Sequence, residues 1–233
     1  MYDLQLGRTG QARLDAAKQM ISTPLETLNC PSRRAAITKV PGSYEPLQAQ
    51  PRYSAPTTVV AINDYAANAG DTFCDPSSFG TGWDHRGPVD HADAESALGL
   101  RRFGMLAAGA TGVVYVGSTI AMRDITDGAS HTIYCAEKYV APDDYAAWAL
   151  DWGDNETMYM GATYDVVRFT DLQPFPDTPG WCGYWRFGSA HAAGFHTCMC
   201  DGSVRMLSYS IDLTIFGRLG HRKDGYAVDA SKL

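Results

Sequence analysis

Residues 151–156 hold the densest group of candidate metal ligands in the sequence: Asp151, Asp154, Asn155 and Glu156. Oxygen donors of this kind bind hard cations, so Ca²⁺ is the one cofactor that the sequence suggests. Their spacing does not match an EF-hand loop. The same residue types are also typical of a solvated turn, and the sequence leaves both interpretations open.

Tryptophan side chains surround this acidic segment, in an aromatic and irregular region over residues 141–187. They are Trp148, Trp152, Trp181 and Trp185. An exposed indole ring can stack on a sugar, whereas a buried one closes a core. A carbohydrate-binding module with glycan ligands is therefore an alternative function for the chain.

A second pair of carboxylates, Asp124 and Asp127, precedes Gly128. Both are candidate oxygen ligands of a cation. We favour a turn in which the carboxylates accept hydrogen bonds from backbone N–H groups and Gly128 adopts positive φ. Turn chemistry alone explains these residue types.

Histidine and cysteine recur in residues 191–200, at positions that suggest a zinc site: His191, His196, Cys198 and Cys200. On a straight strand the last three spread over about 13 Å, too far to converge on one ion. For His191 we expect a structural role, with the imidazole bonded to backbone groups of a neighbouring loop. The histidines and aspartates of residues 84–93 are expected to form a polar loop rather than a metal site.

Composition and motifs argue against several classes of protein. The chain has 233 residues and a formal net charge of -7, which disfavours nucleic-acid binding. No apolar run is long enough to span a membrane, and residues 1–10 lack the apolar segment of a signal peptide. Because no hydrolase, metalloprotease or phosphate-loop motif occurs, we predict that the protein is not an enzyme. A hydrolase with a cleft in the aromatic region is a less favoured alternative.

The six cysteines allow two interpretations. They can form disulfides in an oxidising compartment, or several can be small buried thiols. Cys198 and Cys200 are not expected to bridge each other, because neighbouring positions on one side of a strand are poorly placed for a disulfide.

Two β-favouring runs flank Asp201-Gly202, which predicts a hairpin with a two-residue type I′ turn. This register pairs Cys198 with Arg205 and His196 with Leu207. The predicted core face then contains Phe195, Thr197, Met199, Val204 and Met206. The predicted wetter face contains His196, Cys198, Cys200, Ser203 and Arg205.

The remaining patterns favour an α+β fold and one domain over residues 1–233. Its parts are an N-terminal helix and strand (1–30), a Pro/Gly-rich connector (31–96) and a sheet core (97–233). We predict helices over 10–21 and 213–219, the second capped by Asp212, and a helical turn within 97–105. Predicted strands cover 25–28, 57–62, 112–116 and 132–136, and residues 63–96 are predicted to be loop.

The hairpin region resembles a bacterial family signature in which a His, nine further residues and Asp-Gly follow at fixed spacing, here His191 and Asp201-Gly202. The family is the prepilin-type processing-associated H-X9-DG proteins, abundant in planctomycetes, which carry a domain of unknown function. Similar stretches are Leu28–Arg34, Asp64–Gly70 and Asp124–Ile133 with Glu137, although the family usually has Asn where this chain has His131. Residues 208–212 and 222–225 also match.

This resemblance implies a pilin-like antiparallel sheet with short helices and long irregular loops. It also implies a non-enzymatic, pseudopilin-like structural or assembly protein of the cell envelope or extracellular space. Typical members begin with a leader and a long apolar helix, which this sequence lacks. The expected partners are therefore other pilin-like subunits or a chain that supplies the helix, and an apolar groove is expected where that helix would lie.

Overall fold

The computed structural model describes residues 7–41, 53–72, 90–149, 151–161, 163–226 and 228. The α-helices are α1 (Gly10–Ile21), α2 (His91–Glu95), α3 (Ala97–Gly109) and α4 (Leu213–Gly220). Short 3₁₀ helices cover Glu26–Leu28, Met122–Asp124, Ala129–His131 and Pro142–Asp144. The strands are β1 (Thr38–Lys39), β2 (Val60–Ala61), β3 (Tyr65–Gly70), β4 (Ile133–Glu137), β5 (Val167–Phe169), β6 (Phe175–Pro176), β7 (Gly188–Ser189), β8 (Phe195–Met199) and β9 (Val204–Leu207). The predicted α+β class is confirmed.

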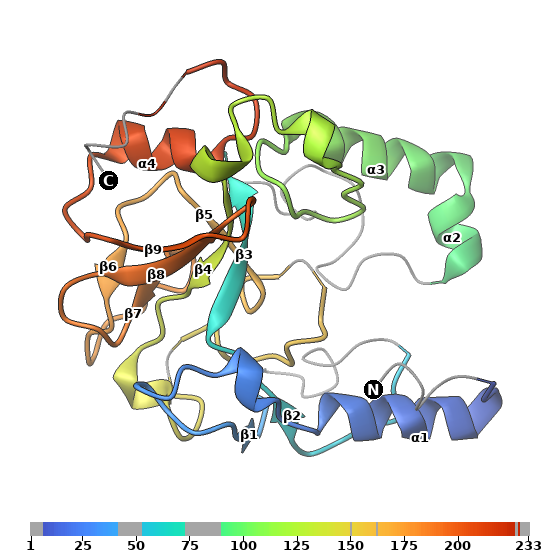
Figure 1. The fold of residues 1–233 in the computed structure, drawn as a ribbon. Helices are drawn as coiled ribbons and strands as arrows, with labels where there is room; N and C mark the ends of the chain where they lie inside the picture. Colours follow the sequence, from blue (N-terminus) through green and yellow to red (C-terminus); the bar gives the residue numbers. More distant parts are fainter. Residues whose placement is uncertain are drawn as a thin grey trace.

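The main sheet has five strands in the order β5-β3-β4-β8-β9 (Figure 1). Neighbours are antiparallel except β3 and β5, which are parallel, so the sheet is mixed and not the wholly antiparallel sheet that the resemblance implied. Two small two-stranded sheets, β1-β2 and β6-β7, complete the described strands. In Figure 1, α4 lies near one end of β3, and α1 with the β1-β2 pair lies near the other.

Helix ends and strongly patterned segments match the predictions. The helix over 10–21 and the strand over 132–136 correspond to α1 and β4. Asp212 caps α4, because its carboxylate accepts hydrogen bonds from the backbone N–H groups of Thr214 and Ile215. The helical turn predicted within 97–105 is the longer helix α3.

Three segment predictions are wrong. Within the predicted strand over 25–28, residues 26–28 form a 3₁₀ helix, and residues 112–116 form no strand. The predicted loop over 63–96 contains α2 and β3, and β3 lies between β5 and β4 in the main sheet. The amide of Asn68 donates to the carbonyls of Ile133 and Gly220, so a polar side chain fixes this strand instead of an apolar alternation.

The hairpin of β8 and β9 forms in a different register from the predicted one. Cys198 pairs with Val204 and His196 with Met206, one position away from the prediction. Gly202 has φ +85°, and no described non-glycine residue has positive φ, which rules out a type I′ turn. Residues 200–202 instead form a three-residue loop, in which the Asp201 carboxylate accepts from the backbone N–H of Ser203. This one-residue shift moves Val204 and Met206 to the opposite face of the sheet.

The inner face of the sheet packs against α4. Phe216 of α4 contacts Phe187 and Phe195 edge-on. The core around them consists of Ala66, Ile133, Ala136, Met199, Leu207, Ile211, Leu219 and Val228. Burial of these side chains stabilises the sheet by about 1.5–3 kcal/mol for each large one.

Candidate functional site

The other face of the sheet, here called the outer face, is open over β4, β8 and β9. The residues on it, or exposed beside it, are Tyr134, Cys135, Glu137, His196, Cys198, Val204 and Met206. Val204 is 66% exposed and Met206 48%, although both occupy strand positions. A register irregularity between Ile133 and Cys135 leaves Tyr134 52% exposed next to them. The outer face therefore presents apolar side chains to solvent.

Over β3 and β5 this same face is covered. Ala69 of β3 and Val167 and Phe169 of β5 pack with Ala110 and Tyr115 in a second apolar cluster. The connection after α3 thus closes one half of the outer face, and the half formed by β4, β8 and β9 stays accessible.

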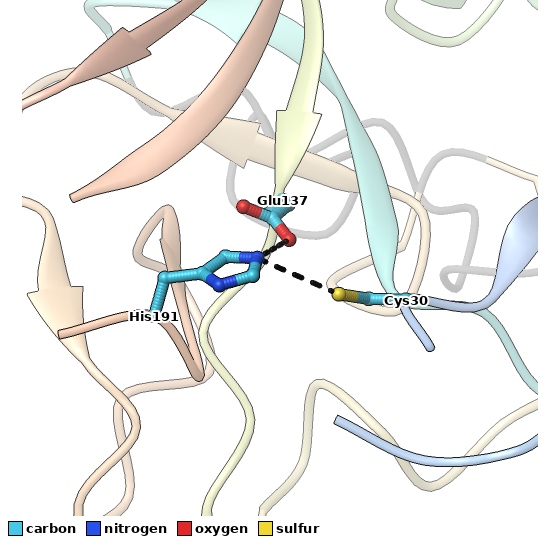
Figure 2. A group of neighbouring side chains, drawn as sticks. All are labelled: Cys30, Glu137 and His191. Carbon is cyan, nitrogen blue, oxygen red and sulfur yellow. Dashed lines mark hydrogen bonds and ion pairs between the residues drawn. The ribbon is translucent and has the colours of Figure 1, made fainter. Parts of the chain in front are cut away.

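A Cys/Glu/His group lies at the β3 end of the open half, where Glu137 pairs with Tyr65. The Nε2 atom of His191 lies 3.3 Å from Oε1 of Glu137 and 3.8 Å from Sγ of Cys30 (Figure 2). One ligand atom of each residue lies within 4.8 Å of the others. Figure 2 shows the three side chains converging from three separate segments of the chain. Within the described ranges, no other His, Cys, Asp or Glu side chains meet in such a group.

Glu137 is the most constrained member of this group. It is 1% exposed, and its Oε2 atom accepts hydrogen bonds from the backbone N–H of His196 (2.7 Å) and from Nδ1 of the same residue (3.2 Å). These two bonds hold the carboxylate so that Oε1 faces His191.

The backbone also fixes Cys30 and His191. The N–H of Cys30 donates to Oδ2 of Asp64 at 2.8 Å, and its carbonyl accepts from the backbone N–H groups of Arg33 and Arg34. The N–H of His191 donates to Oγ of Ser189, and its carbonyl accepts from the Tyr209 hydroxyl. Thiol and imidazole are therefore presented from rigid turns.

The electrostatics of the group disfavour the thiolate form of Cys30 when no metal is bound. Burial raises the pKa of Cys30 above its usual value, and the neighbouring Glu137 carboxylate raises it further. A cysteine–histidine nucleophile needs the opposite, an imidazole that lowers the thiol pKa while its second nitrogen meets an orienting group. Here the thiol and the carboxylate both approach Nε2, so the geometry is that of converging ligands rather than a relay.

A buried network of ion pairs adjoins the group, on the other side of the Cys30–Arg34 turn. Its cations are Arg33, Arg34, Lys39 and Lys138, and its carboxylates are Asp64, Asp154 and Asp177. Their side chains are at most 5% exposed. Ion pairing holds the pKa of Asp154 well below its usual range, although burial alone would raise it.

The predicted Ca²⁺ residues are buried, and one of them, Asp154, belongs to this network. Asp154 binds Arg34, Lys39 and Lys138, and Asp151 accepts from the backbone N–H groups of Gly153 and Ala141. Asn155 and Glu156 are buried as well. The Asp154 carboxylate thus pairs with protein cations, and the Asp151 carboxylate accepts hydrogen bonds from backbone N–H groups. Because residues 154–156 are buried, this segment is not the solvated turn that the sequence also allowed. The Ca²⁺ site stays a prediction.

The four predicted ligand-binding tryptophans are half-buried. Trp148 contacts Trp152 edge-on at 5.2 Å between centroids. Trp181 packs against Tyr139 and Phe175, and Trp185 against Tyr184. Each indole contacts another aromatic ring, and glycan binding by these residues stays a prediction.

The carboxylates before Gly128 contact the backbone. Asp124 accepts from the N–H of Ala121, and Asp127 from that of Gly225. Gly128 has φ +101°. These contacts match the favoured turn interpretation for Asp124, and they add a long-range one for Asp127, which ties the chain near its C-terminus to this turn.

The histidines and cysteines occupy other positions than the sequence suggested. The His191 imidazole contacts the side chains of Cys30, Glu137 and His196, and not the backbone groups expected for it. Cys198 lies opposite Cys135 in the sheet, away from the Cys30 group. Among the described cysteines, Cys30, Cys135, Cys198 and Cys200 are free thiols. Of the loop over 84–93, residues 84–89 lie outside the described ranges, and Asp90 caps α2 through the N–H of Asp93.

Sequence reasoning singled out His191 but missed its partners. Cys30, Glu137 and His191 are far apart in the chain, Cys30 and His191 by 161 positions. Each of the three residues lies in a different stretch that resembles the family. Their common membership in the family motifs was the one indication in the sequence that they meet.

Comparisons with known proteins identify the family of the chain. A family model with the description protein of unknown function DUF1559 matches residues 5–214. No curated protein and no solved structure matches the chain. Among the described residues no helix has the length and apolar character needed to cross a membrane. With most of its length matched, the chain belongs to the DUF1559 family of proteins of unknown function.

Proposed function

We propose that the chain is a non-enzymatic, pseudopilin-like protein of the cell envelope or extracellular space that assembles with other pilin-like subunits through the outer face of its sheet. The single observation behind this proposal is the exposure of Tyr134, Val204 and Met206 on the open half of that face. Exposed apolar side chains gathered in one place are typical of protein interaction sites.

The dimensions of this surface suit a helix. Tyr134 lies on β4 and the other two residues on β9, with β8 between them. Neighbouring strands are about 4.8 Å apart, so three of them present a strip about 10 Å wide. An α-helix with its side chains has a diameter of about 10–12 Å. We therefore propose that the occupant is an apolar helix supplied by a pilin-like subunit.

The absence of enzymatic activity is part of the proposal. It is supported by the geometry of Cys30, Glu137 and His191, which does not form a relay among the described residues. A relay would place the nucleophile and the orienting carboxylate on different imidazole nitrogens.

Site-specific photocrosslinking in cells that produce the protein tests the assembly surface. A photoreactive amino acid replaces Met206 on the outer face or, as a control of similar exposure, Leu213 on α4. We expect position 206 to crosslink to an apolar helix of a pilin-like subunit, identified by mass spectrometry, and position 213 not to do so. Equal crosslinking from both positions, or none from position 206, contradicts the proposal.

A further inference from the structure

We propose that Cys30, Glu137 and His191 bind one Zn²⁺ ion, with a water molecule as the fourth ligand. This inference is independent of the assembly proposed above, because it rests on the ligand atoms at one end of the outer face and not on its apolar strip.

The spacing of the three side chains fits a tetrahedral ion. With bond lengths of about 2.0–2.3 Å, two ligand atoms of tetrahedral Zn²⁺ lie about 3.3–3.8 Å apart. The His191 Nε2 to Glu137 Oε1 distance of 3.3 Å and the Cys30 Sγ to His191 Nε2 distance of 3.8 Å fall in this range. A small rotation of the Cys30 side chain completes the arrangement, since all three atoms already lie within 4.8 Å of one another.

The types of the donors select the metal. A thiolate and an imidazole are poor ligands for Ca²⁺ or Mg²⁺, which prefer oxygen. A sulfur, a nitrogen and a carboxylate oxygen match Zn²⁺, which binds all three in tetrahedral sites. Zn²⁺ displaces the proton of the Cys30 thiol, which is released to solvent. The thiolate and the Glu137 carboxylate then neutralise the charge of the ion, which matters because Glu137 is 1% exposed and Cys30 3% exposed.

Each ligand has support from neighbouring groups, as bound metals require. His196 holds Oε2 of Glu137 through its backbone N–H and its Nδ1 atom. The backbone of Cys30 is anchored on Asp64, and that of His191 on Ser189 and Tyr209. Such outer contacts orient ligands before the metal arrives.

The site is open on one side. The side chain of His191 is 26% exposed and that of His196 42%, whereas that of Glu137 is 2% exposed. Solvent therefore reaches the group past the two imidazoles. An ion can arrive by this route, and a water molecule on this side fills the fourth position, as in zinc sites with three protein ligands.

Zinc binding by the purified 233-residue chain tests the proposal. The chain is stripped with EDTA, dialysed against Zn²⁺ and analysed by elemental mass spectrometry, and its affinity is measured by competition with a chelator. We expect one Zn²⁺ per chain. With Co²⁺ as a spectroscopic substitute, we expect a near-ultraviolet thiolate-to-cobalt charge-transfer band.

Single substitutions assign the ligands. We expect Cys30→Ser to remove the charge-transfer band, and both Cys30→Ser and His191→Gln to weaken Zn²⁺ binding at least about 100-fold. Cys198→Ser on β8 and Cys200→Ser in the hairpin loop are matched controls, and we expect both to keep the band and the affinity. Circular dichroism confirms that each variant is folded.

Three results overturn the proposal. They are no stoichiometric Zn²⁺ in the wild-type chain, an affinity that Cys30→Ser leaves unchanged, and binding that only the Cys198 or Cys200 variant abolishes. None of these results affects crosslinking at position 206, so the two proposals fail separately.

Discussion

Two groups of polar side chains extend from the same turn, residues 30–34, into different surroundings. Arg33 and Arg34 point into the ion-pair network, where partners such as Asp64 and Asp154 have fully buried side chains. The Cys30 thiol instead lies beside Glu137 and His191, where the imidazole is 26% exposed. One group is closed and the other is open.

The pairing inside the two groups differs as well. In the network, four cations meet three carboxylates, and Asp154 alone contacts Arg34, Lys39 and Lys138. In the Cys30 group, a carboxylate and a thiol share one imidazole nitrogen. A closed network in which charges are paired fixes structure, whereas an open group of converging donors has room for a ligand. We therefore propose a ligand-binding role for the second group and a structural role for the first.

Breaking the network should have the largest effect on stability. Asp154→Ala leaves three buried cations without this carboxylate, so we expect the free energy of unfolding to fall by about 3–5 kcal/mol. Urea denaturation measures it. Asp15→Ala, which removes an exposed carboxylate on α1, is the control and should change stability by no more than about 0.5 kcal/mol. Similar losses in both variants would mean that the network has no special structural role.

Acid should weaken the network for the same reason. Its ion pairs hold the pKa of Asp154 below that of an unfolded aspartate, about 3.9. The folded state then binds fewer protons than the unfolded state, so this contribution is fully present above about pH 5 and is lost as the pH falls below about 4. In urea titrations from pH 7 to pH 3, we expect the stability difference between the wild-type chain and Asp154→Asn to shrink with falling pH. A constant difference would contradict the ion-pair explanation.

Addition and removal of Zn²⁺ test the Cys30 group. If Zn²⁺ binds the folded Cys30 group, free Zn²⁺ at about 100 times its Kd stabilises the chain by about 2.7 kcal/mol. We expect the thermal midpoint to rise with Zn²⁺ and to return to its initial value with EDTA. The Cys30→Ser variant should show no rise, and a rise in that variant would place the metal elsewhere.

The sequence predicted the parts of this arrangement that local chemistry controls. Helix α1, strand β4 and the Asp212 cap of α4 follow from apolar spacing, β-favouring residues and a side chain that reaches its own backbone. Strand β3 does not, because Asn68 is satisfied by carbonyls 65 and 152 positions away. Such bonds leave no local pattern.

The hairpin shows how a small local error changes a functional surface. Asp201-Gly202 is compatible with a two-residue and a three-residue loop, and tertiary contacts select the longer one. One of them is the bond from the Asp201 N–H to the Ala129 carbonyl. The one-residue difference decides whether Val204 and Met206 are buried or exposed. The Cys30 group depends on longer-range contacts still, since its members meet only when three segments fold together.

The smallest expected effect concerns His196. Its substitution distinguishes a metal ligand from a residue that only orients a ligand. It donates to the Glu137 oxygen that faces away from His191, so we predict that it orients the carboxylate and does not bind the metal. His196→Ala keeps the backbone N–H bond and loses only the imidazole bond. We expect about tenfold weaker Zn²⁺ binding, equal to about 1.4 kcal/mol, with the Co²⁺ charge-transfer band retained. A loss as large as that of His191→Gln would instead identify His196 as a fourth ligand, and the open position on the solvent side would be filled by the protein.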